Sequence, residues 1–196
     1  MRKKKILAIV VHPDDEAIWM GGMLLANRDK WKATIISLCR KKDKDRAPRF
    51  KKACKIYGAK GFMSDLDDTE KGYYKKIKTK DIIKRIARFT YGDYDYIFTH
   101  GKNGEYGHIR HKQICKAVKE MLKNKKLKCK KIFFFSYKKK NEICFADKNA
   151  DKFIKLSNLI FKKKKYLIQK IYGFKKNSFE ERCCKNIEAF DVKDLK

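Results

Sequence analysis

Short apolar runs recur along the first two thirds of the chain, and stretches of helical length separate them. The clearest run is residues 6–11, ILAIVV, which no polar residue interrupts. Continuous runs of this length are typical of strands that are buried on both faces of a parallel sheet. The five predicted strands comprise residues 6–11, 33–38, 61–63, 94–99 and 131–136.

The segments between these runs have the length of helices. The predicted helices comprise residues 16–31, 49–57, 80–90 and 111–122. Strands and helices that alternate at this spacing predict right-handed crossovers between parallel strands. We therefore expect an α/β fold, with a Rossmann-like, open, mainly parallel sheet and helices on both faces. In such sheets ligands bind beyond the carboxyl ends of the strands.

The pattern changes after residue 150. Residues 151–172 are rich in lysine and predict one long helix, and a polar tail follows. A chain of 196 residues is long enough for one well-buried domain and short for two. We expect a single domain over residues 1–196, with an α/β core at 1–136 and a basic, helical C-terminal extension at 150–196.

Charge is the unusual feature of the composition. The chain has 53 lysines and arginines against 23 aspartates and glutamates, which gives a net charge of +30. Only nine of these cations are arginines, whereas recognition of phosphates or bases in fixed geometry usually draws on arginine forks. The lysines are spread over nearly every segment. General surface charge therefore explains them at least as well as a nucleic-acid footprint does, and no dedicated nucleic-acid motif is present.

The cysteines and the N-terminus bear on the compartment. Seven cysteines are scattered along the chain, and none forms a C-x-x-C pair, so free thiols in a reducing compartment are expected. The basic start and the apolar run after it imitate a signal peptide, but the run is too short and lacks a cleavage site. No stretch approaches the roughly 20 apolar residues that a transmembrane helix needs. We expect a cytoplasmic location.

A histidine and three acids follow the first predicted strand directly, in the order His12-Pro13-Asp14-Asp15-Glu16. A helix start explains the proline and the acids of the first turn. It does not explain His12 beside two adjacent carboxylates, whereas a metal site with His12 and one aspartate as ligands does. Successive helical positions are turned by about 100°. One aspartate can therefore bind the metal while the other faces the bound water.

A second cluster follows the fourth predicted strand. It contains three of the four histidines of the chain, namely His100, His108 and His111. His108 and His111 are three residues apart at a predicted helix start, so their rings share a face. Because both clusters follow strands of one sheet, we expect a joint metal site. Two histidines and a carboxylate also bind Fe²⁺ in oxygenases. Those triads are expected on an all-β jelly roll, however, and not on a βα chain.

The two motifs together resemble those of the LmbE-like (PIG-L) family of zinc-dependent N-acetylglucosaminyl de-N-acetylases. They are His12-Pro-Asp-Asp-Glu16 and Gly104-Glu-Tyr-Gly-His-Ile-Arg-His111, and the resemblance covers about residues 5–136. It implies that His12, Asp15 and His111 bind Zn²⁺, with Fe²⁺ as the alternative metal. It further implies that Asp14 is the general base and that His108, preferably protonated, stabilises the oxyanion.

Several positions need a separate interpretation. Arg46 resembles an arginine with which family members often contact substrate, although a surface ion pair explains it equally well. Arg110 stands directly before the last histidine, where the family often has an acid, and Arg49 stands where a glutamate is common. The acids of Asp65-Leu-Asp-Asp68 follow the third strand, and we interpret them as turn residues rather than as ligands of sugar hydroxyls.

The resemblance implies a zinc hydrolase that removes the acetyl group from an N-acetylglucosamine-type sugar conjugate. The basic surface favours an anionic conjugate, such as a nucleotide, a lipid diphosphate or a phosphoinositide. The lysine-rich residues 161–166 allow peripheral membrane contact. Two alternatives stay open: a polyanion- or RNA-binding protein with an inactive metal site, and a zinc amidohydrolase that acts on a non-sugar amide.

Overall fold

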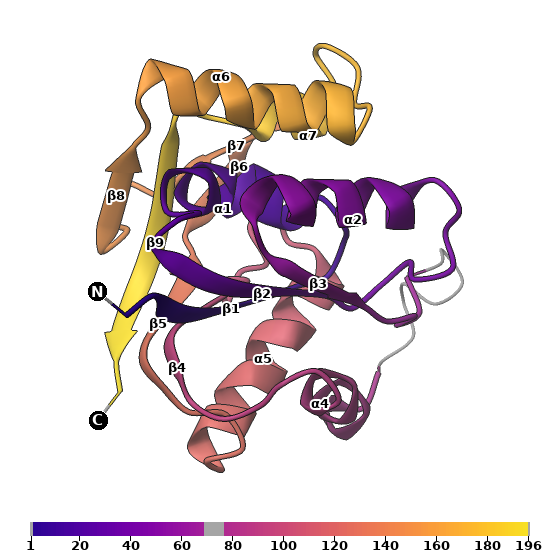
Figure 1. Ribbon diagram of the computed structural model, residues 1–196, viewed down its shortest axis with the longest axis vertical. Coiled ribbons are helices and arrows are strands. Elements are labelled where there is room, and N and C mark those ends of the chain that lie inside the picture. Colours follow the sequence, from indigo (N-terminus) through magenta and orange to yellow (C-terminus); the bar gives the residue numbers. More distant parts are fainter. Residues whose placement is uncertain (1, 69–76, 196) are drawn as a thin grey trace.

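A seven-stranded sheet runs through the molecule in the computed structural model, which describes residues 2–68 and 77–195 (Figure 1). The strand order is β3-β2-β1-β4-β5-β9-β8. The five strands expected from the sequence pair in parallel with one another. They are β1 (Lys4–Val10), β2 (Trp31–Ser37), β3 (Lys60–Met63), β4 (Tyr94–Thr99) and β5 (Cys129–Phe135). The predicted α/β fold with a mainly parallel sheet is thus confirmed.

Helices cover both faces of the sheet (Figure 1). On one face lie α1 (Asp15–Ala26) and α2 (Arg46–Tyr57), and on the other lie α4 (Thr79–Ala87) and α5 (Ile109–Lys123). The first helix ends at Ala26 and not at residue 31, because Trp31 already begins β2. Across the described parts of the chain, no helix combines the length and the apolar character needed to cross a membrane.

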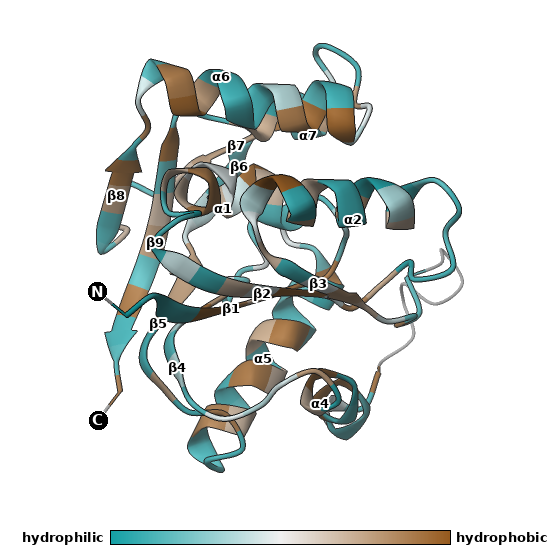
Figure 2. Ribbon diagram, in the orientation of Figure 1, coloured by the Kyte–Doolittle hydropathy of each residue, from teal (hydrophilic) through white to brown (hydrophobic). Residues whose placement is uncertain are grey.

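The apolar sequence of β1 follows from its position in the middle of the sheet. Even-numbered residues such as Ile6 and Val10 join the core beneath α1 and α2, whereas odd-numbered residues such as Leu7 and Ile9 join the core beneath α4 and α5. All four side chains are fully buried. In Figure 2, β1 is accordingly brown along much of its length, while α5 and α6 alternate between brown and teal.

The C-terminal region extends the sheet, which corrects the expectation of a helical extension. β9 (Ile187–Asp194) pairs antiparallel with β5, and β8 (Lys152–Lys155) pairs antiparallel with β9 at the sheet edge. The prediction of one helix over residues 151–172 is therefore wrong at its beginning. Helix α6 (Asn158–Tyr166) starts only after β8, where the Ser157 side chain accepts a hydrogen bond from the backbone N–H of Ile160.

Four further elements complete this region. They are the strands β6 (Tyr137–Lys140) and β7 (Ile143–Ala146), the π-helix η1 (Leu167–Ile171) and the short helix α7 (Phe179–Cys183). β6 and β7 pair with each other as a separate two-stranded sheet. In Figure 1, α6 lies beyond α1 and α2 as an outer layer. The chain after residue 150 therefore packs on the helices of one face and also supplies strands to the sheet.

Two buried polar contacts fasten the part of the chain after residue 150 to α1. The Glu188 carboxylate of β9 accepts hydrogen bonds from the backbone N–H groups of Gly22 (2.7 Å) and Met23 (2.9 Å) in the middle of α1. It also accepts one from Lys164 Nζ (2.8 Å), and both charged side chains of this pair are fully buried. A Cβ atom at Gly22 would lie 2.4 Å from the Leu156 side chain, which would have to shift to admit it.

The second contact lies nearer the start of α1. The Tyr172 hydroxyl, directly after η1, donates to Glu16 Oε1 at 2.5 Å, and both side chains are buried. Glu16 is thus a partner of the C-terminal region and not merely an acid of a solvated first helical turn. Burial, opposed by this hydrogen bond and reinforced by Asp14, raises the pKa of Glu16 to about 8.

Removal of Glu188 should destabilise the protein far more than removal of an exposed acid on the same strand. Glu188→Ala leaves the Lys164 ammonium and two backbone N–H groups buried without their carboxylate, which typically costs about 3–5 kcal/mol. The matched control is Asp194→Ala, because Asp194 pairs with Lys131 on the surface. Urea unfolding of both variants measures the difference, and equal midpoints would contradict the prediction.

Candidate metal and catalytic site

Two loops at the carboxyl edge of the sheet form the candidate site. One connects β1 to α1 and carries His12, and the other connects β4 to α5 and carries His108. Because β1 and β4 are neighbours in the sheet, these loops adjoin each other. The ring centroid of His12 lies 4.9 Å from that of His108 and 5.4 Å from that of His111. The structure therefore brings together the two clusters that the sequence placed at one edge.

Three donor atoms form a nearly equilateral triangle in these loops. His12 Nδ1 lies 3.3 Å from Asp15 Oδ2 and 3.4 Å from His111 Nε2, and the last two atoms are 3.5 Å apart. Ligand atoms at about 2.0–2.1 Å from a tetrahedral zinc ion are about 3.4 Å from one another. The three side chains could therefore hold one small metal ion.

In each of the two histidines of the triangle, the other ring nitrogen lies within hydrogen-bonding distance of a carboxylate. His12 Nε2 lies 2.9 Å from Asp68 Oδ2, and His111 Nδ1 lies 2.5 Å from Glu105 Oε2. Such carboxylates fix the tautomer and the ring orientation of histidine ligands in metal sites. Burial and the neighbouring His100 ring also lower the pKa of His111, which favours the neutral form that binds metals.

Sequence reasoning missed the roles of Asp68 and Glu105. Glu105 was visible within the second motif, in a run of glycines and histidines, as a single acid beside predicted ligands. Asp68 lies 56 residues from His12 in sequence and looked like one of several turn acids. The structure makes Asp68 a partner of His12, so the interpretation of this run as a plain turn is wrong for this residue.

The second loop is built around Glu105. Glu105 and the two nearby glycines, Gly104 and Gly107, adopt left-handed backbone conformations with φ of 58°, 68° and 97°. The buried Glu105 carboxylate accepts from the Gly101 backbone N–H (2.7 Å) and also bonds His100 Nδ1 (2.9 Å). Burial opposes its ionisation, but the His100 and His111 rings lower the pKa of Glu105 to about 2.

His100 is a structural link rather than a member of the cleft. Its Nε2 accepts a hydrogen bond from the backbone N–H of Val11 at 3.0 Å, and its ring stacks on His111 with centroids 3.8 Å apart. The side chain is fully buried. His100 therefore ties the end of β4 to the end of β1 from behind the triangle.

The charges around the triangle favour a cation. Burial opposes ionisation of Asp15, but the His111, His100 and His12 rings hold the pKa of that carboxyl well below its usual range. Burial likewise opposes protonation of His12, but the hydrogen bonds with Asp15 and Asp68 raise its pKa to about 10. A place where carboxylates stay charged and a histidine prefers a proton is one that also attracts a metal cation.

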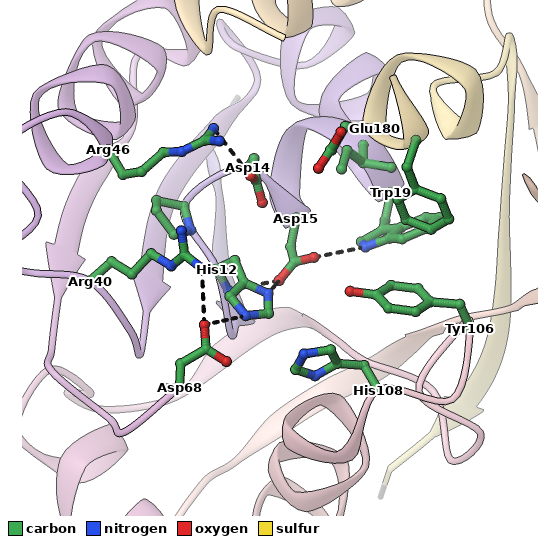
Figure 3. A pocket seen from close by; sticks show the side chains of 13 residues that line it. His12, Asp14, Asp15, Trp19, Arg40, Arg46, Asp68, Tyr106, His108 and Glu180 are labelled. Atoms are coloured by element: carbon green, nitrogen blue, oxygen red, sulfur yellow. Dashed lines mark hydrogen bonds and ion pairs between the residues drawn. The ribbon is translucent and has the colours of Figure 1, made fainter. Parts of the chain in front are cut away.

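Asp14 lines the cleft on the side of Arg46 (Figure 3). Its Oδ2 lies 3.6 Å from Arg46 Nη1. Burial and the charge of Asp15 raise the pKa of Asp14 to about 7, although His12 and Arg46 oppose this shift. The two neighbouring aspartates thus have different partners: Asp15 belongs to the triangle, whereas Asp14 pairs with Arg46.

His108 is the N-cap of α5. Its Nδ1 accepts a hydrogen bond from the backbone N–H of Arg110 at 3.2 Å, so the proton of the neutral ring resides on Nε2. Burial and the neighbouring His111 and His12 rings lower the pKa of His108 to about 3. This shift opposes the expected protonation of His108, because two imidazoles adjoin the ring and Asp68 is engaged with His12. The neutral ring carries its one N–H group at Nε2.

The cleft has a volume of about 290 Å³ and opens beside these groups (Figure 3). Trp19 and Tyr106 lie on one side of it and Arg40 and Arg46 on the other. Residues from α7, Phe179 and Glu180, complete its lining. The C-terminal region, for which the sequence offered no matching motif, therefore contributes a wall of the site.

Arg46 lies at the rim of this cleft, as the first residue of α2. Its guanidinium lies over the Phe174 ring, 4.3 Å from the centroid. Nη1 is buried and has no hydrogen-bond partner among the described residues, apart from its ion pair with Asp14. Arg49, by contrast, bonds Asp45 at 2.6 Å and the Ile171 carbonyl at 3.0 Å, and so fastens α2 to η1.

The fold and this cluster define an α/β protein with a candidate metal site at the carboxyl edge of its sheet, of the kind that hydrolases use. The chain belongs to the PIG-L family, because the family model, described as GlcNAc-PI de-N-acetylase, matches residues 7–122. This membership confirms the resemblance read from the two motifs and supports an enzyme. The sequence has no match among curated proteins.

Solved structures share the fold at low sequence identity. GalB, the 4-carboxy-2-hydroxymuconate hydratase of Pseudomonas putida, matches with a TM-score of 0.72 and 14% identity over 98% of this chain and 97% of its own. N,N'-diacetylchitobiose deacetylase of Pyrococcus horikoshii matches with a TM-score of 0.70 and 16% identity over 97% and 84%. The A40926 pseudoaglycone deacetylase Dbv21 matches with a TM-score of 0.63 and 15% identity over 98% of each chain.

Loss of the Glu105 charge should weaken metal binding without unfolding the protein. Glu105→Gln keeps the shape of the side chain but removes the anion that orients His111, and such changes typically lower metal affinity about 10–100-fold. Competition with a chromophoric zinc chelator measures the affinity, and circular dichroism checks the fold. Glu142→Gln, on an exposed residue, is the control. Equal affinities of the two variants would contradict the supporting role of Glu105.

Proposed function

We propose that this protein is a zinc-dependent hydrolase that removes the acetyl group from an N-acetylglucosamine-type sugar conjugate. The observation that carries the proposal is the triangle of His12, Asp15 and His111 donor atoms beside an open cleft. Family membership supports the reaction class. Zinc in such a site supplies a Lewis acid that polarises an amide carbonyl and lowers the pKa of water.

Asp14 is the general base and acid of this proposal. Its carboxylate lines the cleft next to the triangle (Figure 3). From there it can take a proton from the attacking water and pass it to the departing amine. Asp15 cannot share this task, because its two oxygens are engaged by the Trp19 indole N–H and by the backbone N–H of His12.

His108 is the group that stabilises the developing oxyanion. It lines the cleft next to His12 and presents its Nε2 side there, since Nδ1 is held by the backbone of α5. Donation of a hydrogen bond from a preorganised N–H group to the tetrahedral oxyanion does not require a positive charge on the ring. The neutral ring therefore suits the role.

The walls of the cleft suit a sugar with an anionic substituent. Trp19, Tyr106 and Phe179 offer apolar surface for the acetyl group and a sugar face. Arg40 and Arg46 add cationic groups at the rim, and Arg46 Nη1 has hydrogen-bonding capacity to spare. An anionic substrate also fits the net charge of +30, which would attract it from solution. A cytoplasmic location and Fe²⁺ as the alternative metal belong to the same proposal.

Two other functions use the same observations differently. A polyanion- or RNA-binding protein would rely on the lysines and would not need the donor triangle. A zinc amidohydrolase for a non-sugar amide would use the same groups with another substrate. The fold does not decide between reactions, since the hydratase GalB shares it. The substrate screen below separates these functions.

Acetate release from a panel of N-acetylated sugar conjugates, with zinc present, is the primary test. We expect activity on at least one conjugate, and we expect Asp14→Asn to lower kcat about 10²–10⁴-fold. Zinc content by mass spectrometry should be unchanged in Asp14→Asn and lost in Asp15→Ala. Release from non-sugar amides alone would favour the amidohydrolase. Zinc-free protein with salt-sensitive polyanion binding would favour the binding protein.

Arg46→Ala should raise KM for anionic conjugates more than for neutral ones. A charge-assisted hydrogen bond to the substrate is worth about 1.5–3 kcal/mol, which corresponds to about 10-fold or more in KM. Arg46→Lys keeps the charge beside Asp14 and controls for effects on that carboxylate. Phosphorylated and neutral N-acetylglucosamine derivatives are the substrates to compare. An equal rise of KM for both would argue against an anion contact.

A further inference from the structure

Arg110 is a fully buried arginine at the start of α5, directly before the candidate ligand His111. A guanidinium is costly to bury unless its N–H groups are hydrogen-bonded. This chain therefore places a positive charge beside its candidate metal site. The contacts of Arg110 show what the positive group does there.

The Arg110 side chain reaches from α5 to the loop that follows β3. Its Nε donates to the main-chain carbonyl oxygen of Asp67 at 2.9 Å. Its Nη1 donates to Gln113 Oε1 at 2.8 Å, on the same helix, and this bond orients the guanidinium. Arg110 therefore fastens the loop after β3 to the helix that carries His111.

The next residue of that loop supports the other histidine of the triangle. Asp68 Oδ2 lies 2.9 Å from His12 Nε2 and accepts from Arg40 Nη2 at 3.3 Å. His12 turns its other nitrogen, Nδ1, to Asp15 and His111. Asp68 is thus placed to fix the tautomer and the orientation of His12, provided that the loop itself stays in place.

We propose that Arg110 is a positioning residue that holds Asp68 against His12 by fixing the preceding carbonyl of Asp67. This inference rests on the metal site of the proposed function. The Asp67 carbonyl needs a hydrogen-bond donor from position 110, which Arg110 supplies. An ionised carboxylate at this position could not donate such a bond. His111 needs no such tie, because its own support, Glu105, lies only six residues before it, in the loop that leads into α5.

Zinc affinity of the metal-stripped protein tests the inference independently of catalysis. Competition with a chromophoric chelator is measured for the unsubstituted protein, Arg110→Met, Asp68→Asn and the double variant. We expect each single substitution to lower the affinity about 10-fold or more. The double variant should lose no more than Asp68→Asn alone, because Arg110 acts through Asp68. Urea unfolding establishes that each variant is folded.

Arg85→Met is the matched control. Arg85 Nη1 donates to Ser64 Oγ at 3.0 Å, so this arginine also ties a helix, α4, to the loop after β3, but four residues before Asp68. Its substitution should leave zinc affinity within about twofold. A loss equal to that of Arg110→Met would mean that any loosening of the loop has the same effect, which would overturn the specific role of Arg110.

Other outcomes are equally decisive. Unchanged zinc affinity in Arg110→Met, or an additive loss in the double variant, overturns the inference while leaving the metal site intact. If Arg110→Met does not fold, Arg110→Lys and Arg110→Gln replace it, and unchanged affinity in both overturns the inference. Failure of the unsubstituted protein to bind zinc overturns the proposed function and this inference together.

Discussion

Buried negative charge is the constraint on which the arrangement of this site depends. Asp15 and Glu105 are both excluded from solvent, and a buried carboxylate is stable only where donors or cations surround it. Imidazole rings from the ends of β1 and β4 surround these two, together with the Trp19 indole and the backbone N–H groups of His12 and Gly101. Displacement of either loop would leave a buried carboxylate without its hydrogen-bond donors. The loops that carry the candidate catalytic groups are thus held by the same charges that would hold a metal ion.

The fold could be predicted from the sequence as far as the parallel strands extend, because continuous apolar runs mark strands that are buried on both faces. The C-terminal strands lack this mark. β8 is four residues long with a lysine at each end, and β9 carries Glu188 at a fully buried position. Glu188 is tolerated there because Lys164 and two backbone N–H groups of α1 surround it, which is a property of the packing and not of the local pattern.

The candidate site was predictable where its residues are neighbours in sequence. Composition and spacing identify two groups of candidate residues: His12, Asp14 and Asp15 in the first motif, and His108 and His111 in the second. Asp68 and the residues of α7 do not, because their approach to the cleft depends on the path of the chain after β3 and after η1. The protonation state of His108 was also beyond the sequence. It depends on how many rings and carboxylates crowd the same volume and on which of them are already paired.

The π-helix η1 makes the length of one segment as important as its composition. Within it, Leu167, Ile168 and Ile171 are all buried, and the turn delivers Tyr172 to Glu16 at the start of α1. A π-turn contains an extra residue relative to an α-helix. Deletion of that residue would close the π-turn to an α-turn, so that the side chains within it could not all keep their buried positions. The π-turn thus fixes the number of residues between α6 and Tyr172, whereas the composition of its exposed positions is free to vary.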